Sequence, residues 1–511
     1  MNILRHWIKF WIPHPALLYG IATLLGFYAS FYGAYYILLP ALLLWIPFLL
    51  EKSQIIHLLL SLTLFFAAWG YGKTAYQSSA LPEKGIQGKA HISILSLTNQ
   101  KSPFGVRWIY LCELKSFFSD KHPNTSIASN IKCTVSLIAS DDVVRPLADH
   151  DYILHGTLAQ NEYSDYLVKV SKNNPWDIVD GSWSLAEKRY VWKTEATNWI
   201  KRQFKDRNSG NFLAGLATGN FDDLWMRNEF ARFGLQHIMA ISGFHFAIIA
   251  GMLSLITRSV ISRSASAILL LILMACYCFF LGTNASVLRA WLMCSITLAS
   301  YLWEKQSSSL NSLGVALILV LAFDPLLSKT LAFQFSFLTT SAILLMYSPI
   351  DQLLCNVFAK RRLSEAVEMD KLNQHGYIVL AFFRQGLSMT IAVNLLALPL
   401  TLFYFHQFPV MGILYNFFFP ILISGSMSLL ILGTLVSFIP YVGEWIHNAN
   451  NYYTKKVLQF TYGMPKEIDH YLTLDTFPVV FLIVWICFCC ILMIYLRGRL
   501  AQEIEENFAF I

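Results

Sequence analysis

The feature of this sequence that most limits its fold is a series of long apolar runs. A helix that crosses a membrane needs about 20 mostly apolar residues. Three runs of about this length precede residue 76, and eight more follow residue 234. They cover residues 14–31, 34–50, 54–75, 235–256, 265–283, 285–303, 309–323, 331–348, 378–405, 409–438 and 478–497. Only 14% of the residues are charged, whereas soluble domains carry about 25%. The sequence therefore predicts a polytopic α-helical membrane protein with one soluble insertion.

The basic residues between the runs predict how the chain is oriented. Arg5 and Lys9 precede the first run, and the loop 350–376 holds four more basic residues. Cytoplasmic loops are enriched in lysine and arginine. We therefore expect the N-terminus and this loop in the cytoplasm, and the insertion, after three crossings, on the outer face. The basic tail at Arg497 is then cytoplasmic only if the run 409–438 forms two half-spans or a re-entrant hairpin. The net charge of +7 fits such loops and does not by itself indicate nucleic acid binding.

Residues 76–184 form the insertion, and their pattern predicts a small all-β domain. Five short alternating runs are separated by turn-forming clusters, which is the pattern of an OB-type barrel, although a sandwich stays open. The runs cover residues 91–97, 106–114, 133–138, 152–158 and 166–170. Cys112 and Cys133 are the only cysteines of the insertion. We expect a disulfide between them if the domain faces an oxidising compartment.

The rest of the chain divides into three further segments. In residues 185–208, Trp192 and Trp199 recur at helical spacing with other apolar residues among lysines and arginines. This pattern predicts an amphipathic helix on the membrane surface, with a basic lip for a polyanion as the alternative. Residues 209–440 are predicted to be a second polytopic block. Residues 441–511 are predicted to be a loop, the last spanning helix and a short tail.

Polar residues inside apolar runs are candidates for a functional site, because an ionisable group at mid-membrane costs roughly 2.5–3.5 kcal/mol. The densest group lies in one apolar segment and consists of His237, Ser242 and His245. The step from Ser242 to Gly243 could open the helix and expose backbone groups to a cavity. A hydrolytic Ser/His site stays open, but it lacks a carboxylate partner and a G-x-S-x-G turn. The structural alternative is a pair of histidines bonded within a packed core.

Four more polar side chains lie in later apolar runs. They are Arg289, Gln334, Arg384 and Asn394. For Arg289 the alternative is snorkelling to the membrane interface. If these groups and the histidines face one cavity, they would suit a polar or anionic substrate. No metal site or cofactor is expected.

Several motifs resemble one protein family, the ComEC competence proteins, which are inner-membrane channels for DNA uptake. The longest is Phe-Gly-Leu-Gln-His-Ile-Met-Ala-Ile-Ser-Gly-Phe-His at 233–245, which is similar to the family signature G-L-x-H-hydrophobic-hydrophobic-A-I-S-G-hydrophobic-H. Further similar stretches, in the same order, are Gly-Leu-Ala-Thr-Gly at 215–219, Ser-Val-Leu-Arg-Ala at 286–290, Asp-Pro at 324–325, Gln-Phe-Ser-Phe at 334–337, Pro399, Phe405 and Asn416. The chain departs from the family at Asn220, where an Asp is usual.

The resemblance implies a channel that carries single-stranded DNA into the cytoplasm through the bacterial inner membrane, rather than an enzyme. The residues that would line or gate the path are His237, Ser242, Gly243, His245, Arg289, Gln334, Arg384 and Asn416. The block 209–440 would be the competence-type channel domain, and the OB-like domain would receive the strand outside. Trp108 and Tyr110 could stack on bases there, with core packing as the alternative. Because there is no H-x-H-x-D-H motif, the metallo-β-lactamase-like nuclease domain of many relatives is expected to be missing.

The resemblance also implies partners, and the residues leave other functions open. Expected partners are single-stranded DNA, membrane lipid, a DNA receptor, a cytoplasmic ATPase and a separate nuclease, with oligomerisation open. The competing hypotheses are an intramembrane enzyme or a small-solute transporter that uses the cluster of His237, Ser242 and His245. A third is an assembly platform without transport.

Overall fold

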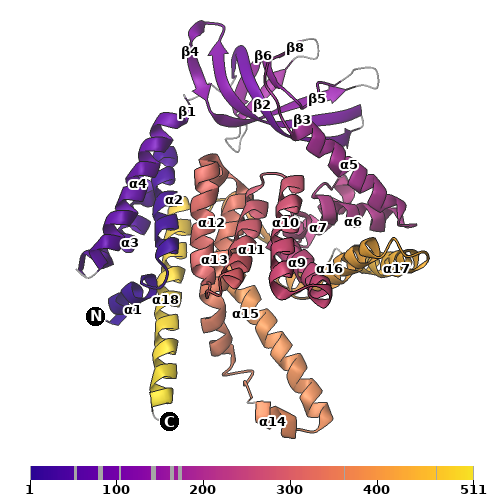
Figure 1. The fold of residues 1–511 in the computed structure, drawn as a ribbon. Coiled ribbons are helices and arrows are strands. Elements are labelled where there is room, and N and C mark those ends of the chain that lie inside the picture. Colours follow the sequence, from indigo (N-terminus) through magenta and orange to yellow (C-terminus); the bar gives the residue numbers. More distant parts are fainter. Residues whose placement is uncertain are drawn as a thin grey trace.

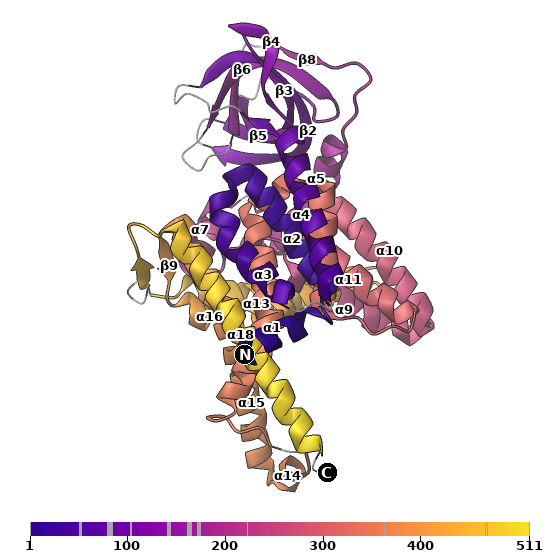
Figure 2. The same cartoon turned by 90° about the vertical axis from the view of Figure 1, so that its left-hand side faces the viewer.

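The computed structural model joins a helical domain to a β-domain that lies at one end of it (Figure 1). It describes residues 2–50, 54–78, 85–102, 105–139, 145–160, 166–170, 175–221, 223–361, 363–465, 467 and 469–509. Both termini lie toward the end of the molecule opposite the β-domain (Figures 1 and 2). The predicted fold class, a polytopic helical membrane protein with an OB-like β-domain, is confirmed.

The N-terminal helices pack as a group against the later helical domain. They are α1 (Asn2–Trp11), α2 (Pro15–Tyr32), η1 (Ala34–Ile37), α3 (Leu38–Leu50) and α4 (Ile55–Ala75). Helix α2 is central to this group, because it packs against α4 on one side and against α12 (Ser309–Phe323) on the other. Their side chains share one hydrophobic cluster with α13 (Leu331–Leu354) and with α18 (Val479–Ala509). The two apolar blocks of the sequence therefore form one helical body.

In the described residues, the β-domain is a closed barrel of five strands with three additional strands. The ring runs β2–β3–β5–β7–β6 and back to β2. Among the described strand pairs, β5–β7 alone is parallel, an arrangement that makes the connection a Greek key, as in OB folds. The strands are β1 (Gln77–Ser78), β2 (Ile86–Ser102), β3 (Gly105–Ser119), β4 (His122–Ser129), β5 (Ile131–Ala139), β6 (Asp151–Gln160), β7 (Tyr166–Val170) and β8 (Trp176–Ile178). All five predicted runs lie in the ring, so the barrel is confirmed over the sandwich.

Polar contacts hold the barrel against one end of the helical domain. Asn130 donates from Nδ2 to the carbonyl of Ala75, the last residue of α4, at 3.0 Å. The Lys132 ammonium pairs with Asp324 at 2.6 Å, where Asp324 caps the turn η3 (Pro325–Lys329). Basic side chains near a helix C-terminus interact favourably with its free carbonyls. Lys193, in the helix that follows the barrel, makes such a contact with Leu281, the last residue of α10 (Arg263–Leu281), at 2.8 Å.

The helix that follows the barrel is shorter than predicted. Helix α5 (Ala186–Arg202) ends before residue 208, and Asp206 caps the next helix, α6 (Arg207–Thr218), by accepting the amide of Ser209. It packs against β2, α6 and α10 and so connects the barrel to the helical domain. Trp192 and Trp199 are partly exposed along it. Its placement on a membrane surface stays a prediction.

The remaining helices form the second part of the helical domain. They are α7 (Leu224–Arg232), α8 (Gln236–Met239), α9 (Gly243–Val260), α10 (Arg263–Leu281), α11 (Ala285–Leu302), α14 (Leu363–Glu368), α15 (Lys371–Phe405), α16 (Gly412–Leu435) and α17 (Val442–Tyr462). Among the described residues, nine helices are long and apolar enough to cross a membrane. They are α2, α4, α9, α10, α11, α13, α15, α16 and α18. The chain is a multi-pass membrane protein.

The region after residue 405 corrects the sequence prediction. The run 409–438 is not split into half-spans, because α16 continues through Pro420 as one helix of 24 residues. The returning leg is α17, in a segment expected to be a loop. Strands β9 (Gln407–Pro409) and β10 (Tyr471–Thr473) pair at the two ends of this hairpin. Helix α18 therefore starts on the side where α15 ends, and it runs beside α1, α13 and α15 (Figure 2).

Candidate functional site in the helical domain

The first residues of the 233–245 signature end helix α7. Gly234 has a φ of +67°, which only glycine adopts at little cost. The amide of Gly234 donates to Ala231, and the amide of Leu235 donates to Phe230, both at 2.9 Å. This is a Schellman motif, completed by contact between the buried side chains of Leu235 and Phe230. This part of the signature has a structural role.

The middle of the signature breaks the apolar run into two helices. Ser242 has an extended backbone and forms the N-cap of α9. Its hydroxyl accepts the amide of His245, and His245 Nδ1 accepts the amide of Ser242 at 3.2 Å. This is a capping box in which histidine takes the place of the usual Glu or Gln. The predicted continuous span 235–256 is therefore wrong: the spanning helix starts at Gly243, and Ser242 and Gly243 open the backbone as the sequence suggested.

The capping box leaves one nitrogen of His245 as a buried donor. Because Nδ1 accepts a backbone N–H, the neutral ring carries its proton on Nε2. His245 is 1% exposed. Among the described residues its Nε2 atom has no hydrogen-bond partner. A buried donor without a partner costs about 1–3 kcal/mol, so this position favours a ligand that brings an acceptor.

Arg289 on α11 reaches the start of α9. Its Nε donates to Ser336 Oγ of α13 at 2.7 Å. A Cβ atom on Gly243 would lie 3.0 Å from Arg289 Nη2, so the guanidinium rests against the glycine backbone. Arg289 is 8% exposed. No carboxylate in the described part of the chain forms an ion pair with it, and its Nη1 contacts only the sulfur of Met293.

The start of α9 therefore presents hydrogen-bond donors without matching acceptors. Gly243 contacts Arg289, and His245 follows two residues later on the same helix. A buried charge without a counter-ion is costly. An anionic or carbonyl-rich ligand would offset that cost, because arginine donates in a fork that fits phosphate. We call Ser242, Gly243, His245, Arg289 and Ser336 the donor cluster.

His237 lies near the donor cluster but is not hydrogen-bonded to it. It belongs to the single turn α8, its side chain is exposed, and Nδ1 contacts the carbonyl of Gly234 at 3.1 Å. It precedes Ser242 by five positions in the sequence. An exposed histidine on a break between helices is placed to meet a ligand that approaches the cluster.

Two further predicted path residues, Gln334 and Arg384, have their hydrogen-bond partners outside the donor cluster. Gln334 sits two residues before Ser336 and so on another face of α13, where its Oε1 accepts the hydroxyl of Tyr404 at 2.7 Å. Arg384 of α15 pairs at 3.0 Å with Asp351, which lies near the C-terminal end of α13. None of its described contacts involves the cluster. The expectation that these groups converge on one cavity is not met.

Asn416 and Asn394 lie on neighbouring helices. Asn416 sits on α16, which packs against α9, and among the described residues its buried Oδ1 has no hydrogen-bond partner. Asn394 donates to the carbonyl of Thr390 within its own helix. Asn416 therefore offers an unused acceptor on a helix that packs against α9, whereas Asn394 is satisfied locally.

Sequence reasoning missed two partners that fix the arginines. Ser336 holds Arg289, and Asp351 holds Arg384. Ser336 could have been identified from the sequence, because it belongs to the same Gln-Phe-Ser-Phe stretch as Gln334. Asp351 lies beyond the end of its predicted span, where an acidic residue gives no signal of its own.

In the barrel, the candidate stacking residues belong to the core. Tyr110 is fully buried, and its hydroxyl donates to Pro146 at 2.8 Å. Trp108 packs against Tyr190 of α5, with the Arg145 guanidinium 4.5 Å from its ring centroid. The structural alternative holds for Tyr110, whose ring is closed to a base. Trp108 is only partly buried, but the Arg145 guanidinium covers one face of its ring and Tyr190 packs against it.

The two barrel cysteines face one another. Cys112 on β3 and Cys133 on β5 are direct partners in the antiparallel ladder. Both thiols are buried and free in the structure, and burial raises the pKa of Cys133 to about 12. Directly opposed residues are close enough for a bond. The disulfide stays a prediction.

Comparison with known proteins identifies the family. The model of the family described as Competence protein matches residues 223–499, more than half of the chain. ComE operon protein 3 of Bacillus subtilis (strain 168) is 30% identical over 188 residues, which are 36% of this chain and 24% of that protein. The chain thus aligns with about a quarter of that relative's length. No solved structure matches. The chain belongs to the Competence protein family, as its resemblance to the ComEC proteins predicted.

Proposed function

We propose that this protein carries single-stranded DNA through the bacterial inner membrane into the cytoplasm during natural transformation. Membership of the Competence protein family supports a role in competence. A strand with one negative charge per nucleotide cannot cross hydrocarbon without a polar path. A protein with this function therefore has to offer hydrogen-bond donors to the strand inside its helical domain, and the strand has to be released from them again.

The observation that carries this proposal is the donor cluster. Arg289 is a buried cation without a carboxylate partner among the described residues, and His245 adds a buried donor two residues from Gly243. One fixed guanidinium suits a phosphate that must bind and then move on. A dense lining of basic residues would hold the strand too tightly, because each phosphate contact adds to the affinity.

The position of the barrel fits the same function. OB folds bind single strands in a positively charged groove with aromatic platforms, and this barrel is fixed to one end of the helical domain by Lys132 and Asn130. We propose that the barrel lies outside the cytoplasm and receives the strand there. A DNA receptor, a cytoplasmic ATPase and a separate nuclease would then be partners.

The enzyme hypothesis receives less support from the same residues. Ser242 Oγ lies 3.2 Å from His245 Nδ1, but that nitrogen already accepts a backbone amide. A general base needs its second nitrogen held by a further group. Among the described residues, Nε2 of His245 has none. The pair therefore works as a helix cap, and transport fits better than hydrolysis.

The test is import of labelled double-stranded DNA in the natural host. We would compare wild type, a deletion strain and Arg289→Gln, with Arg258→Gln as the matched control. Arg258 is an exposed arginine at the other end of α9. We expect label to reach the cytoplasm in wild type and in the control, to stop outside in the deletion strain, and to be imported at a strongly reduced but measurable rate in Arg289→Gln. Unchanged import in the deletion strain would overturn the proposal.

A further inference from the structure

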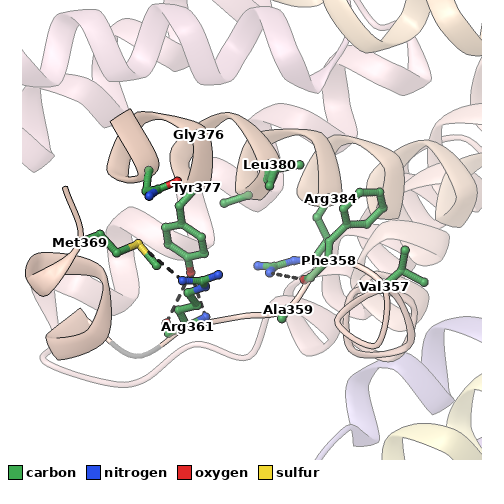
Figure 3. A pocket seen from close by; sticks show the side chains of 11 residues that line it. Val357, Phe358, Ala359, Arg361, Met369, Gly376, Tyr377, Leu380 and Arg384 are labelled. Carbon is green, nitrogen blue, oxygen red and sulfur yellow. Dashed lines mark hydrogen bonds between the residues drawn. The ribbon is translucent and has the colours of Figure 1, made fainter. Parts of the chain in front are cut away.

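A cavity of about 440 Å³ lies where helices α13 and α15 meet the loop between them. One wall is α15, and the other is the segment 357–361 that follows α13 (Figure 3). This is the loop that its basic residues predict to be cytoplasmic. The cavity is separate from the donor cluster, because no residue of that cluster lines it.

The cavity sits at a boundary between polar and apolar surface. The first turns of α15, residues 371–376, are polar apart from Leu372, whereas Ile378, Val379 and Phe383 further along are apolar and exposed. Exposed apolar side chains on a spanning helix face lipid, and tyrosine is enriched at the interface. Tyr377 stands at this change and lines the cavity. The cavity therefore opens at the level of lipid headgroups.

Two arginines line the cavity, and among the described residues only one of them has a carboxylate partner. Arg384 is neutralised by Asp351 and also donates to the carbonyl of Phe358 at 3.2 Å. The backbone of Arg361 is held by the Tyr377 hydroxyl at 3.2 Å, and its guanidinium contacts the sulfur of Met369. No described carboxylate forms an ion pair with Arg361. Figure 3 shows both guanidinium groups reaching into the space between the two walls.

We propose that this cavity binds the phosphate headgroup of an anionic phospholipid from the cytoplasmic leaflet. Arg361 would contact the phosphate, Asn373 and Tyr377 would meet polar headgroup atoms, and the acyl chains would follow Leu380 along α15. Basic pockets between helices on the cytoplasmic side are the usual binding places of such headgroups. The mixed lining of charged and apolar residues fits a lipid better than a free anion.

The test is binding of short-chain lipids to the full-length protein in detergent, followed by native mass spectrometry. The probes are dioctanoyl phosphatidylglycerol, dioctanoyl phosphatidylcholine and inorganic phosphate. We expect phosphatidylglycerol to bind best. Arg361→Gln should weaken its binding about tenfold, the loss expected for one charge-assisted hydrogen bond. Lys360→Gln removes the same charge from a neighbour that does not line the cavity, and it should have little effect.

A second pair of variants tests the cavity without changing charge. Gly376 lines the cavity, and a Cβ there would meet no atom within 4 Å, so Gly376→Trp should fit and fill the space. Gly251→Trp, on α9, also extends into open space and is the control. Gly376→Trp should abolish phosphatidylglycerol binding while Gly251→Trp preserves it.

Four results would overturn the proposal. They are equal losses in Arg361→Gln and Lys360→Gln, equal binding of the two lipids, unchanged binding in Gly376→Trp, and competition by inorganic phosphate at the same concentration as the lipid. The last result would assign the cavity to a free anion.

Discussion

Replacing Gly243 with alanine tests whether the donor cluster acts on DNA through Arg289. The added Cβ would lie 3.0 Å from Arg289 Nη2, closer than ordinary contact. The guanidinium is the end of a flexible side chain, so it would retreat while the backbone stays. Gly243 has a negative φ, since it is absent from the described residues with positive φ. Alanine is also the better helix former. We therefore expect Gly243→Ala to fold as well as wild type.

The expected functional loss follows from the contact that the guanidinium would make. A hydrogen bond to a charged group contributes about 1.5–3 kcal/mol. At 1.4 kcal/mol per factor of ten, losing one such bond to phosphate reduces transport by about 10- to 150-fold. Gly251→Ala is the matched control, because it adds the same methyl group to the same helix in open space.

The assay is import of labelled DNA, with the amount of folded protein measured in the same membranes. We would also combine Gly243→Ala with Arg289→Gln, because residues that act through one another are not additive. If Gly243 acts through Arg289, the double variant imports no less DNA than Arg289→Gln alone. Wild-type import by Gly243→Ala, or additive losses in the double variant, would refute the reasoning.

Three further predictions concern the cap and the barrel. His245→Gln should keep the capping box and the stability of the protein, since glutamine accepts the same amide. His245→Ala should lower the free energy of unfolding by about 1 kcal/mol. Both variants should lose DNA import if Nε2 contacts the strand. Arg145→Met should destabilise the barrel by about 1–3 kcal/mol, because it removes the charge-assisted hydrogen bonds to the partly buried Glu187 carboxylate. Hydrogen exchange of β2 and β3 in the full chain measures this. Burial alone would raise the pKa of Glu187, but hydrogen bonds from Arg145 and from the Ala148 amide lower that pKa below its ordinary value. The ionised Glu187 therefore stabilises the fold at any pH above the ordinary pKa of a glutamate, and this contribution is lost as the pH falls through the lower pKa of the folded state. Thiol labelling of the unfolded, membrane-extracted chain without reductant should count two fewer thiols than with reductant, and Cys112→Ser should abolish the difference; equal counts would contradict the Cys112–Cys133 disulfide.

Most of the barrel could be predicted from the local pattern of apolar and polar residues. All five ring strands were predictable, because alternation of apolar and polar residues reports a half-buried strand directly. The short strands β1, β4 and β8 were not predicted, since they have little alternation of their own and depend on pairing with neighbours. The pairing of Cys112 with Cys133 was an inference from count alone, and only the register of β3 and β5 places them opposite each other.

For the candidate site, the residue pattern identifies polar side chains but does not predict which of them come together. His237, Ser242, His245 and Arg289 were identified because polar groups in apolar runs are costly, and that signal is local. Whether such side chains meet at one site depends on how the helices pack. Gln334 and Arg384 are also polar groups in apolar runs, yet they contact Tyr404 and Asp351 rather than the donor cluster. Helix α17 was expected to be a loop because its asparagines and lysines lower its hydropathy, although one face packs against α16.

The sequence by itself determined where most of the apolar helices lie, the strands of the barrel ring and the family, since each depends on residues near one another in the chain. Only the tertiary structure decided that Gly243 supports Arg289, that Ser336 orients it, and that the hairpin of α16 and α17 returns the chain to the side where α15 ended. The reason is physical: these features depend on contacts between helices far apart in sequence, and hydropathy reports that a side chain is buried but not against which neighbour.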